Sequence, residues 1–497
     1  MDLTARLHEA FGETLYVDSL AEADGVAFAL TRAGSDKQLL VLAPAGQARL
    51  MAFAGEGADF GAELTLVRCP LTDANARALS AALPHLRPAP LGLATSAGCG
   101  DRLGLATPGH VRAFRSVAAT PGARPVAPIF AQQSIREMTR TRRTPQDVMR
   151  DATFGALESG WRGPLGADAD HLKTPADVEA CAAAGFTFYT IDPGAHVDSA
   201  ADSAAPETVR AKVQALDWAA LESSPEAWQR RYAGQTFELE DRRLTLEVEA
   251  VWRAAAKYGN AIAHVARLYR HVAAQGVPFE LEVSVDETET PTTHGEHVLI
   301  ASELKRLGVR WVSLAPRYVG RFEKGVDYLG DLKALAADLA GHAAVARALG
   351  PYKLSLHSGS DKFSVYPLIM AAARGRVHLK TAGTSYLEAL RTLARVQPAL
   401  FRAIAVLAIE RYPQDRASYH VSAELSRVPA IAARPDSELP SLLDQFDARE
   451  VLHVTFGSAL AQFGPEILAA LRAHETEHYA ALERHFIRHL QPFAASV

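Results

Sequence analysis

Histidines and acids gather at the ends of short apolar runs in this 497-residue chain. Three such clusters are Asp168-Ala-Asp170-His171, Asp286-Glu287-Thr-Glu289 and His357-Ser-Gly-Ser-Asp361-Lys362. Two histidines and a carboxylate that project from separate elements into one pocket can hold a divalent ion with open positions, as catalytic zinc sites do. We therefore predict His171, Glu287 and His357 as metal ligands. Since neighbours in a strand face opposite sides, only one of residues 286 and 287 is expected to point inward.

The remaining histidines favour other roles. His294 and His297 lie in TPTTHGEHV, which reads as a loop that opens a helix, so capping or support of a site is favoured over metal binding. HETEH (474–478) matches the HExxH pattern of zinc proteases, but it lies in a charged helix far from the apolar runs and is interpreted as unrelated to metal. Surface or packing roles are expected for four further histidines: His264, His271, His478 and His485.

Two segments could bind an anion. HSGSDKFS (357–364) places small residues before an apolar helix, where backbone N–H groups can hold a carboxylate or phosphate. The residues predicted to contact the substrate there are Ser358, Asp361, Lys362, Lys380 and Thr381. GCGDRLG (98–104) adds Asp101 and Arg102 in a glycine-rich turn. Neither G-x-G-x-x-G nor a P-loop occurs, so no NAD is expected.

Eight short apolar runs alternate with helical stretches and must position these residues. They are LGLATS (91–96), VAPIFAQQS (126–134), GPLGADAD (163–170), FTFYTID (186–192), LEVSVDE (281–287), VRWVSLAP (309–316), YKLSLHS (352–358) and VHLKTAG (377–383). This alternation is typical of a parallel sheet buried on both faces, and eight units that close on themselves form a (β/α)₈ TIM barrel, an α/β fold. In such a barrel the chemistry gathers at the carboxyl ends of the strands.

The rest of the chain flanks this barrel. Residues 1–90 alternate as GVAFALTRAG, KQLLVLAP and ARLMAFAGEG, which predicts a small β-rich unit ending at a proline-rich stretch. We expect the barrel to span 91–390, with a helical insert at about 193–280, and a mostly helical extension over 391–497. YHVSAEL (419–425) and EVLHVTFG (450–457) are competing candidates for the eighth strand.

Composition excludes several classes of protein. Lys and Arg number 52 and Asp and Glu 57, so the net charge of −5 disfavours nucleic-acid binding. The 48% hydrophobic share is that of a globular protein, and no apolar run is long enough for a membrane span. No signal peptide is recognised, so a cytoplasmic location is expected. The three cysteines are widely spaced, which leaves any metal to histidines and carboxylates.

The strand-end residues resemble those of class II, metal-dependent aldolases. The similar segments are APIFAQQS, ADADH, FTFYTIDPGAH, LSLHSGS and HLKTAGTS. The resemblance implies that Asp170 is a general acid/base and that His171 and His357 are metal ligands. Aldolases usually offer a metal-binding histidine at the sixth strand, whereas APRYVGRFEKG (315–325) has none. Glu287 is therefore taken as the third ligand.

Longer segments resemble the tagaturonate/fructuronate epimerase family. They include SVDETETPTTHGEHVLIASELKRLGVRWVSLAPRYVGRFEKGVDYLGD, YKLSLHSGSDKFSVYP, GDRLGLATPGHVRAF, ADADHLKT and EVLHVTFG, and the resemblance covers most of the chain. It implies a metal-dependent isomerase that interconverts D-tagaturonate and D-fructuronate by inverting C4. Some members act on the corresponding neutral ketoses.

The inverted carbon is β to the ketone, so a base alone cannot epimerise it. Retro-aldol cleavage of C3–C4, assisted by a divalent ion such as Zn²⁺ or Mn²⁺, followed by rotation of the aldehyde and re-addition, is the expected route. Asp170 is one acid/base, and its partner is open among Asp192, Glu289 and His453. An anionic sugar needs positive contacts, for which Lys173, Arg317 and Lys380 are candidates.

Two rival functions remain open at this stage. A metal-dependent lyase would release the cleavage products, and a sugar-binding barrel would catalyse nothing. A ketose 4-epimerase that acts on tagatose and fructose is an alternative to the uronate epimerase. The expected partner is a small keto-sugar, with no nucleic acid or membrane, in a possible homo-oligomer.

Overall fold

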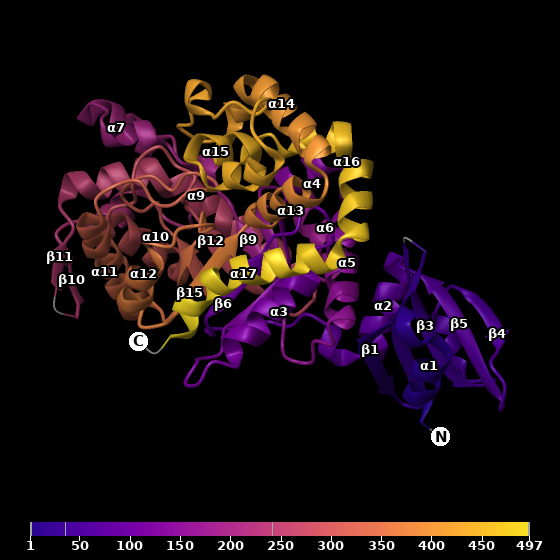
Figure 1. The fold of residues 1–497 in the computed structure, drawn as a ribbon. Helices are drawn as coiled ribbons and strands as arrows, with labels where there is room; N and C mark the ends of the chain where they lie inside the picture. Colours follow the sequence, from indigo (N-terminus) through magenta and orange to yellow (C-terminus); the bar gives the residue numbers. More distant parts are fainter. Residues whose placement is uncertain (1, 35, 241, 496–497) are drawn as a thin grey trace.

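Eight parallel strands close into a barrel at the centre of the protein (Figure 1). The structure is a computed structural model and describes residues 2–34, 36–240 and 242–495. The strands are β6 (Ser96–Cys99), β7 (Ala127–Ser134), β8 (Gly166–Leu172), β9 (Phe188–Ile191), β12 (Glu280–Ser284), β13 (Ser313–Ala315), β14 (Lys353–Leu356) and β15 (Val377–Thr381). Each pairs in parallel with the next, and β15 pairs with β6 to close the ring. The predicted (β/α)₈ barrel is confirmed.

Helices follow the barrel strands and cover the outside. They are α3 (Thr107–Ala118), α4 (Ile135–Thr141), α5 (Pro145–Glu158), α6 (Pro175–Ala184), α9 (Val248–Ala274), α10 (His294–Arg306), α11 (Leu332–Leu349), α12 (Tyr366–Ala372) and α13 (Thr384–Val396). Several begin with reciprocal side-chain caps, as in Thr174 with Asp177 at α6, because these satisfy N–H groups that have no partner within the helix.

The two faces of β12 separate apolar from polar side chains. In β12, Leu281 and Val283 belong to the hydrophobic core, whereas Glu280, Glu282 and Ser284 alternate with them. The acids contact residues of other barrel strands: Glu282 lies 3.1 Å from the Lys380 ammonium group. The inside of this barrel is therefore lined by a buried polar network, which extends toward the carboxyl ends of the strands.

Three predicted strand positions differ from the structure. Of LGLATS only Ser96 is in β6, because residues 92–93 form a turn in which Gly92 has a φ of 59°. YHVSAEL contains no strand, and EVLHVTFG spans the junction of α15 (Phe446–Val454) and α16 (Phe456–Ala473). The closed ring of strands leaves no free edge with which either segment could pair.

An antiparallel sheet forms the N-terminal part of the chain and lies at one side of the barrel (Figure 1). Its order is β1-β2-β3-β5-β4, with β1 (Leu15–Ala23), β2 (Val26–Ala33), β3 (Asp36–Pro44), β4 (Glu56–Asp59) and β5 (Leu64–Pro70); α1 (Leu3–Phe11) and α2 (Asp73–Ala82) accompany it. GVAFALTRAG and KQLLVLAP are the expected strands, but ARLMAFAGEG begins as a 3₁₀ helix, Ala48–Ala52. Lys37 joins the sheet to the barrel through Glu158, at 2.7 Å.

The insert between β9 and β12 is mainly helical, as expected, with α7 (Pro206–Gln214), α8 (Pro225–Tyr232) and the 27-residue α9. It also contains a hairpin of β10 (Thr236–Leu239) and β11 (Arg242–Thr245), which the sequence pattern does not predict. After α13 come α14 (Pro398–Asp415), α15, α16 and α17 (Glu475–Ala494). Helix α17 runs along α3 (Figure 1). The domain limits at residues 90 and 390 stay predictions.

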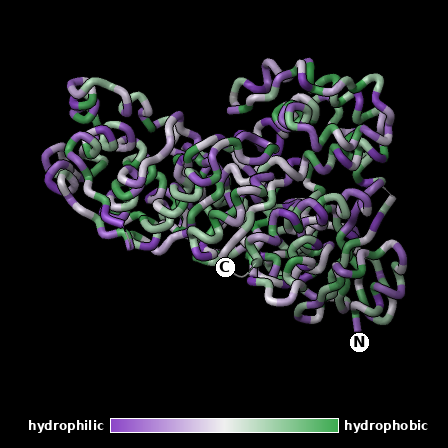
Figure 2. The backbone as a smooth tube through the Cα atoms, turned by 60° about the vertical axis from the view of Figure 1, so that its left-hand side comes forward, coloured by the Kyte–Doolittle hydropathy of each residue, from purple (hydrophilic) through white to green (hydrophobic). Residues whose placement is uncertain are grey.

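Polar and apolar residues are interspersed along most of the chain (Figure 2). Among the described residues no single helix is long and apolar enough to cross a membrane. One bent pair, α15 and α16 at 74°, reaches the required length and composition only when the two helices are taken together.

Candidate active site

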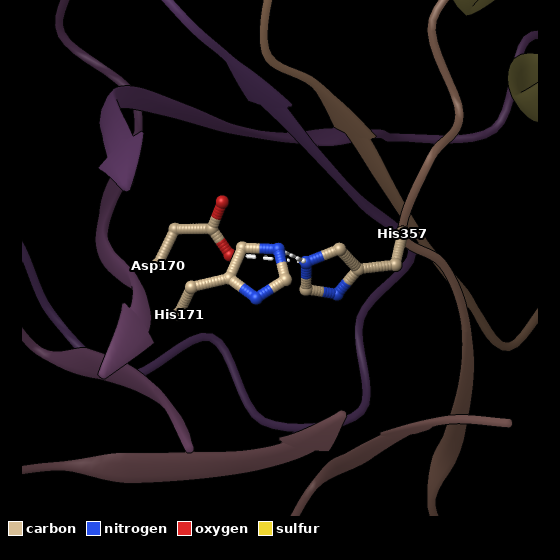
Figure 3. Close-up of side chains that lie close together, drawn as sticks. All are labelled: Asp170, His171 and His357. Atoms are coloured by element: carbon tan, nitrogen blue, oxygen red, sulfur yellow. Dashed lines mark hydrogen bonds and ion pairs between the residues drawn. The ribbon is translucent and has the colours of Figure 1, made fainter. Parts of the chain in front are cut away.

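A distortion in β8 places Asp170 and His171 at the same end of the barrel. Neighbouring residues of a regular strand face opposite sides. Between Ala169 and Leu172, however, the pairing of β8 with β9 shifts in register, and His171 adopts a left-handed φ of 53°. A bulge of this kind redirects side chains and is tolerated by histidine better than by most residues. Asp170 and His171 therefore lie side by side (Figure 3).

His357 approaches this pair from the end of β14, across the barrel mouth. Its Nε2 lies 2.7 Å from Nε2 of His171 and 3.2 Å from Oδ1 of Asp170. Figure 3 shows the two rings with their Nε2 edges turned toward each other and the carboxylate beside them. The ligand atoms of these three buried residues all lie within 4.8 Å of one another.

A buried carboxylate holds the opposite nitrogen of each ring. Asp192 Oδ2 lies 3.1 Å from Nδ1 of His171, and Glu282 Oε1 lies 3.2 Å from Nδ1 of His357. Carboxylates in this position orient metal-binding histidines and keep Nε2 free as the ligand atom. Both rings are thus aimed at one point by groups that lie behind them.

The charges around the rings favour a cation. Burial alone would lower the pKa of His357, but the carboxylates of Asp286 and Asp170 raise it to about 10. Burial would also lower the pKa of His171, but the carboxylates of Asp170 and Glu287 outweigh this effect and raise it. For Asp170, burial is overcome by Lys380 and the two histidines, which hold its pKa well below the usual range. The site therefore takes up protons when no metal ion neutralises its carboxylates, and its donor set fits a divalent ion.

Glu287 lies farther from this centre than Asp170 does. Its Oε1 is 3.9 Å from Nε2 of His171 and accepts a hydrogen bond from Arg136 at 2.9 Å. Glu287 belongs to an overlapping group with His171 and Asp192. Since β12 ends at Ser284, the expectation that residues 286 and 287 face opposite sides of a strand is wrong, and both line the same cavity.

Two adjoining cavities open above the strand ends. The first has a volume of about 30 Å³ and contains Asp170, His171 and His357 in its wall. The second is larger, at about 250 Å³, and includes Asp286 and Glu287. Both are lined by the same five residues at their junction: Glu323, Lys324, His357, Ser358 and Tyr419. A small sugar reaching His357 would lie at this junction.

The comparisons with known proteins agree on one family. The model of the tagaturonate epimerase family matches residues 16–493. This chain belongs to the tagaturonate epimerase family. It is 39% identical over 488 residues to the tagaturonate/fructuronate epimerase of Thermotoga maritima, covering 97% of both chains. Two crystal structures of a fructuronate-tagaturonate epimerase from Cohnella laeviribosi, one native and one with glycerol, match at 34% identity with a TM-score of 0.90 and 99% of each chain covered.

Membership in this epimerase family makes the protein an isomerase, and it gives the cavity residues a substrate to contact. Of the predicted contacts, Arg102, Ser358, Lys362 and His453 line the first cavity, and Arg317 and Ser358 line the second. Lys362 donates to three backbone carbonyls, of Glu323, Val326 and Ser360, so its ammonium group holds the loop that contains Lys324. Arg102 is paired with Glu137 at 2.6 Å.

Several residues predicted as substrate contacts of this epimerase lie elsewhere. The buried Lys380 ammonium group lies 2.7 Å from Asp170 and 2.8 Å from Asp168. The Thr381 hydroxyl donates to the Gly98 carbonyl. The buried carboxylate of Asp361 pairs with Arg449 at 2.9 Å. These three side chains are held within the protein, and their contacts fit a structural role.

Three more candidates lie outside both cavity linings. The carboxylate of Asp101 accepts backbone N–H groups of Leu103, Gly104 and Ala106, which stabilises its own loop. Lys173 is 54% exposed and pairs with Asp192 at 3.2 Å. Glu289 is exposed on the loop after β12. Of the suggested partners of Asp170, Asp192 is committed to His171 and Gly194, whereas His453 lines the first cavity.

Two residues of the site, Glu282 and Lys324, were not predicted from the sequence. Glu282 is fully buried and supports His357; its signal is an acid that alternates with Leu281 and Val283 in an apolar strand. Lys324 follows the sixth strand, in the segment noted only for its lack of histidine. Its Nζ bonds the Ser358 hydroxyl at 2.9 Å. Among the described residues, no carboxylate lies within ion-pairing distance of it.

Proposed function

We propose that this protein interconverts D-tagaturonate and D-fructuronate by inverting C4, numbered from the ketose end. The single observation that carries the proposal is the convergence of the His171 and His357 Nε2 atoms, 2.7 Å apart, with Asp170 beside them at the mouth of the barrel. The similarity to the epimerase of Thermotoga maritima over 97% of the chain supports the substrate.

We assign the two histidines and Asp170 to the metal. Zn²⁺ or Mn²⁺ suits this mixture of imidazole and carboxylate donors. A divalent ion held there would supply Lewis-acid polarisation of the substrate ketone. The assignment of Asp170 replaces the sequence-based choice of Glu287, because the Asp170 oxygen is closer to a metal-binding nitrogen, at 3.2 Å against 3.9 Å.

Retro-aldol chemistry is the route that we propose. The C4 hydrogen is not acidic, since the carbon is β to the ketone, but removal of the C4 hydroxyl proton lets the C3–C4 bond break. Rotation of the resulting aldehyde exposes its other face, and addition restores the bond with C4 inverted. Glu287, which lines the second cavity together with His357, is the base in this proposal: it takes the C4 hydroxyl proton and returns it to the C4 oxygen after re-addition. Although burial opposes it, the charges of His171, Lys324 and Arg136 lower its pKa to about 2, so the carboxylate is ionised, while the same charges make it a weak base.

Lys324 is the residue that we propose for the substrate carboxylate. The other lysines and arginines that line the cavities have partners within the protein. Arg102 pairs with Glu137, Arg136 with Glu287 and Arg321 with Glu323, whereas Lys362 and Arg317 donate to backbone carbonyl groups. Lys324 instead bonds a neutral hydroxyl next to His357. A carboxylate at the far end of the sugar would complete an ion pair there while the ketone reaches the metal-binding end.

One experiment tests the proposal against its rivals. The protein is stripped with EDTA, reloaded with Zn²⁺ or Mn²⁺ and incubated with tagaturonate, and the products are followed by NMR. Fructuronate supports the epimerase, two stable fragments would indicate a lyase, and no product would indicate a binding protein. Parallel incubation with D-tagatose compares the neutral ketose 4-epimerase. Activity that survives complete removal of metal would refute the metal-dependent mechanism. A cytoplasmic location and a homo-oligomer stay predictions.

A pair of variants tests the roles assigned to the carboxylates of Asp170 and Glu287. Asp170→Asn is expected to lose metal as His357→Ala does, whereas Glu287→Gln is expected to retain metal and lose turnover. Metal content by elemental analysis and turnover by NMR separate the two effects. The reverse pattern, metal retained in Asp170→Asn and lost in Glu287→Gln, would restore the assignment made from the sequence.

A further inference from the structure

A second group of metal-type side chains lies on the outside of the barrel. His294 begins α10, and Asp338 and His342 lie one turn apart on α11. Nε2 of His294 is 3.4 Å from Oδ1 of Asp338, and Nε2 of His342 is 3.5 Å from the same oxygen. All three ligand atoms lie within 4.8 Å of one another. The group is independent of the site at the strand ends.

We propose that His294, Asp338 and His342 bind a second divalent transition-metal ion, of the Zn²⁺ class, which has a structural role. Tetrahedral coordination with bonds of about 2.0–2.1 Å places neighbouring donor atoms roughly 3.3–3.4 Å apart. The two measured separations from the Asp338 oxygen match this spacing. His294 is 31% exposed, so solvent can supply the remaining ligand and the ion can enter.

An unsatisfied buried atom points to the same ligand. His342 is fully buried, and its Nε2 makes no hydrogen bond among the described residues, although it faces the Asp338 carboxylate. Its other nitrogen, Nδ1, lies 2.9 Å from Nδ1 of His297, whose Nε2 lies 2.8 Å from the Tyr352 hydroxyl. In this row of hydrogen bonds, His342 can carry its proton on Nδ1, which leaves Nε2 unprotonated and able to bind a metal ion. Buried polar atoms without a partner are rare, and a bound cation would satisfy both the nitrogen and the carboxylate.

Gly341 makes room for the third ligand. A Cβ at this position would lie 2.1 Å from Cε1 and 2.2 Å from Nε2 of His294. Glycine inside a helix costs about 1 kcal/mol relative to alanine, so its presence in α11 coincides with a specific steric need. Without metal, Nε2 of His294 lies 3.1 Å from the Asp338 carbonyl oxygen, a contact that metal binding would replace.

The site would brace the loop that follows β13. Asp338 uses its second oxygen, Oδ2, to accept the backbone N–H of Val319 at 3.1 Å. The loop that begins there leads to Lys324 in the cavity. A metal ion on Oδ1 would hold α10, α11 and this loop together through one carboxylate.

A comparable buried group is unsuitable for a cation. Asp361, His485 and His489 also lie within 4.8 Å of one another. There, however, both Nε2 atoms already have partners: that of His489 accepts the backbone N–H of Asp361 at 3.0 Å, and that of His485 lies 2.5 Å from the Thr384 hydroxyl. Among the described candidates outside the active site, only the group at α10 and α11 combines a matching spacing with an unpartnered nitrogen.

Metal stoichiometry of the untagged, full-length protein tests the proposal. The chelator-treated protein is titrated with Co²⁺, and bound metal is counted from the visible absorption of tetrahedral Co²⁺ and by elemental analysis. We expect two ions per chain in the wild type, one in His294→Ala and two in His271→Ala. His271 is the matched control, since it is a 30% exposed histidine that pairs with a carboxylate, Glu179, outside the group.

Gly341→Ala tests the site without removing a ligand. The added methyl group should displace His294 and weaken the second binding step by about 10–100-fold, as loss of a supporting residue does. His357→Ala separates this proposal from the function proposed above: it should lose only the active-site ion, and the remaining ion should disappear when His294→Ala is added. Equal stoichiometry in the wild type and His294→Ala, or unchanged affinity in Gly341→Ala, would overturn the proposal.

Discussion

Replacement of Lys324 by methionine should convert a selective uronate epimerase into one that treats charged and neutral substrates alike. Methionine keeps most of the length of the side chain and removes its charge. The ammonium group bonds the Ser358 hydroxyl at 2.9 Å, beside His357, and has no carboxylate partner within ion-pairing distance among the described residues. The substrate carboxylate is its proposed partner, so the variant should lose that interaction together with the hydrogen bond to Ser358. His171 and Arg136 still lower the pKa of Glu287, so this carboxylate should stay ionised for both substrates.

The size of the loss follows from the geometry. Unit charges 4 Å apart interact by about 4 kcal/mol at an effective dielectric constant of 20, which is an upper bound for a group near the surface. Lys324 is half-buried, so solvent screens part of this energy. A hydrogen bond to a charged group contributes about 1.5–3 kcal/mol, which corresponds to a roughly 10- to 150-fold fall in kcat/KM for tagaturonate. For D-tagatose, kcat/KM should change by less than about twofold.

Initial rates for both substrates, measured by NMR on metal-loaded protein, provide the assay. Lys333→Met is the matched control, because Lys333 is an exposed lysine at the start of α11 outside both cavities. It should leave both rates unchanged. An equal loss for tagaturonate and tagatose in Lys324→Met would show that the residue acts on the shared part of the substrates. No loss for either would refute Lys324 as a substrate contact.

Two further measurements test the proposed metal centre. Glu282→Gln should weaken metal binding about 10–100-fold in competition with a chelator, because the charge that supports His357 is lost. Glu280→Gln is the control and should match the wild type, because the Glu280 carboxylate accepts the Leu91 and Gly92 amides instead. Equal affinities in the two variants would exclude Glu282 as a support. The pKa of His357 is raised to about 10 in the metal-free protein, so below that pH a metal ion must displace a proton from this residue. The apparent affinity for metal should therefore rise with pH, by up to about tenfold per pH unit between about pH 6 and 9. A flat profile in buffered metal titrations would contradict the assignment of His357 as a ligand.

The barrel could be predicted because its signals are local. Each βα unit combines an apolar run with a following helix, and all eight runs correspond to barrel strands even though the first is displaced. The competing segments 419–425 and 450–457 could not be rejected locally, because their alternation resembles that of a strand. Closure of the ring between β15 and β6, a contact between residues nearly 300 positions apart, decides against both.

The site was predicted less completely for a different physical reason. His171 and His357 could be proposed because both follow apolar runs, yet the choice between Asp170 and Glu287 depends on where β12 ends and on the bulge in β8. Neither feature has a local signal in the residues around it. Lys380 illustrates the same limit: its position at a strand end suggested a substrate contact, but its side chain is surrounded by Asp168, Asp170 and Glu282 inside the barrel.

By itself, the sequence determined the order of strands and helices and the types of side chain delivered to the barrel mouth, because hydrophobic periodicity and residue chemistry are local properties. Only the tertiary structure decided which of those side chains meet. Distances such as the 2.7 Å between the His171 and His357 nitrogens depend on the closure and stagger of strands far apart in the chain. The same closure places Glu282 behind His357 and leaves Lys324 without a carboxylate partner among the described residues, facing the cavity where a substrate anion would bind.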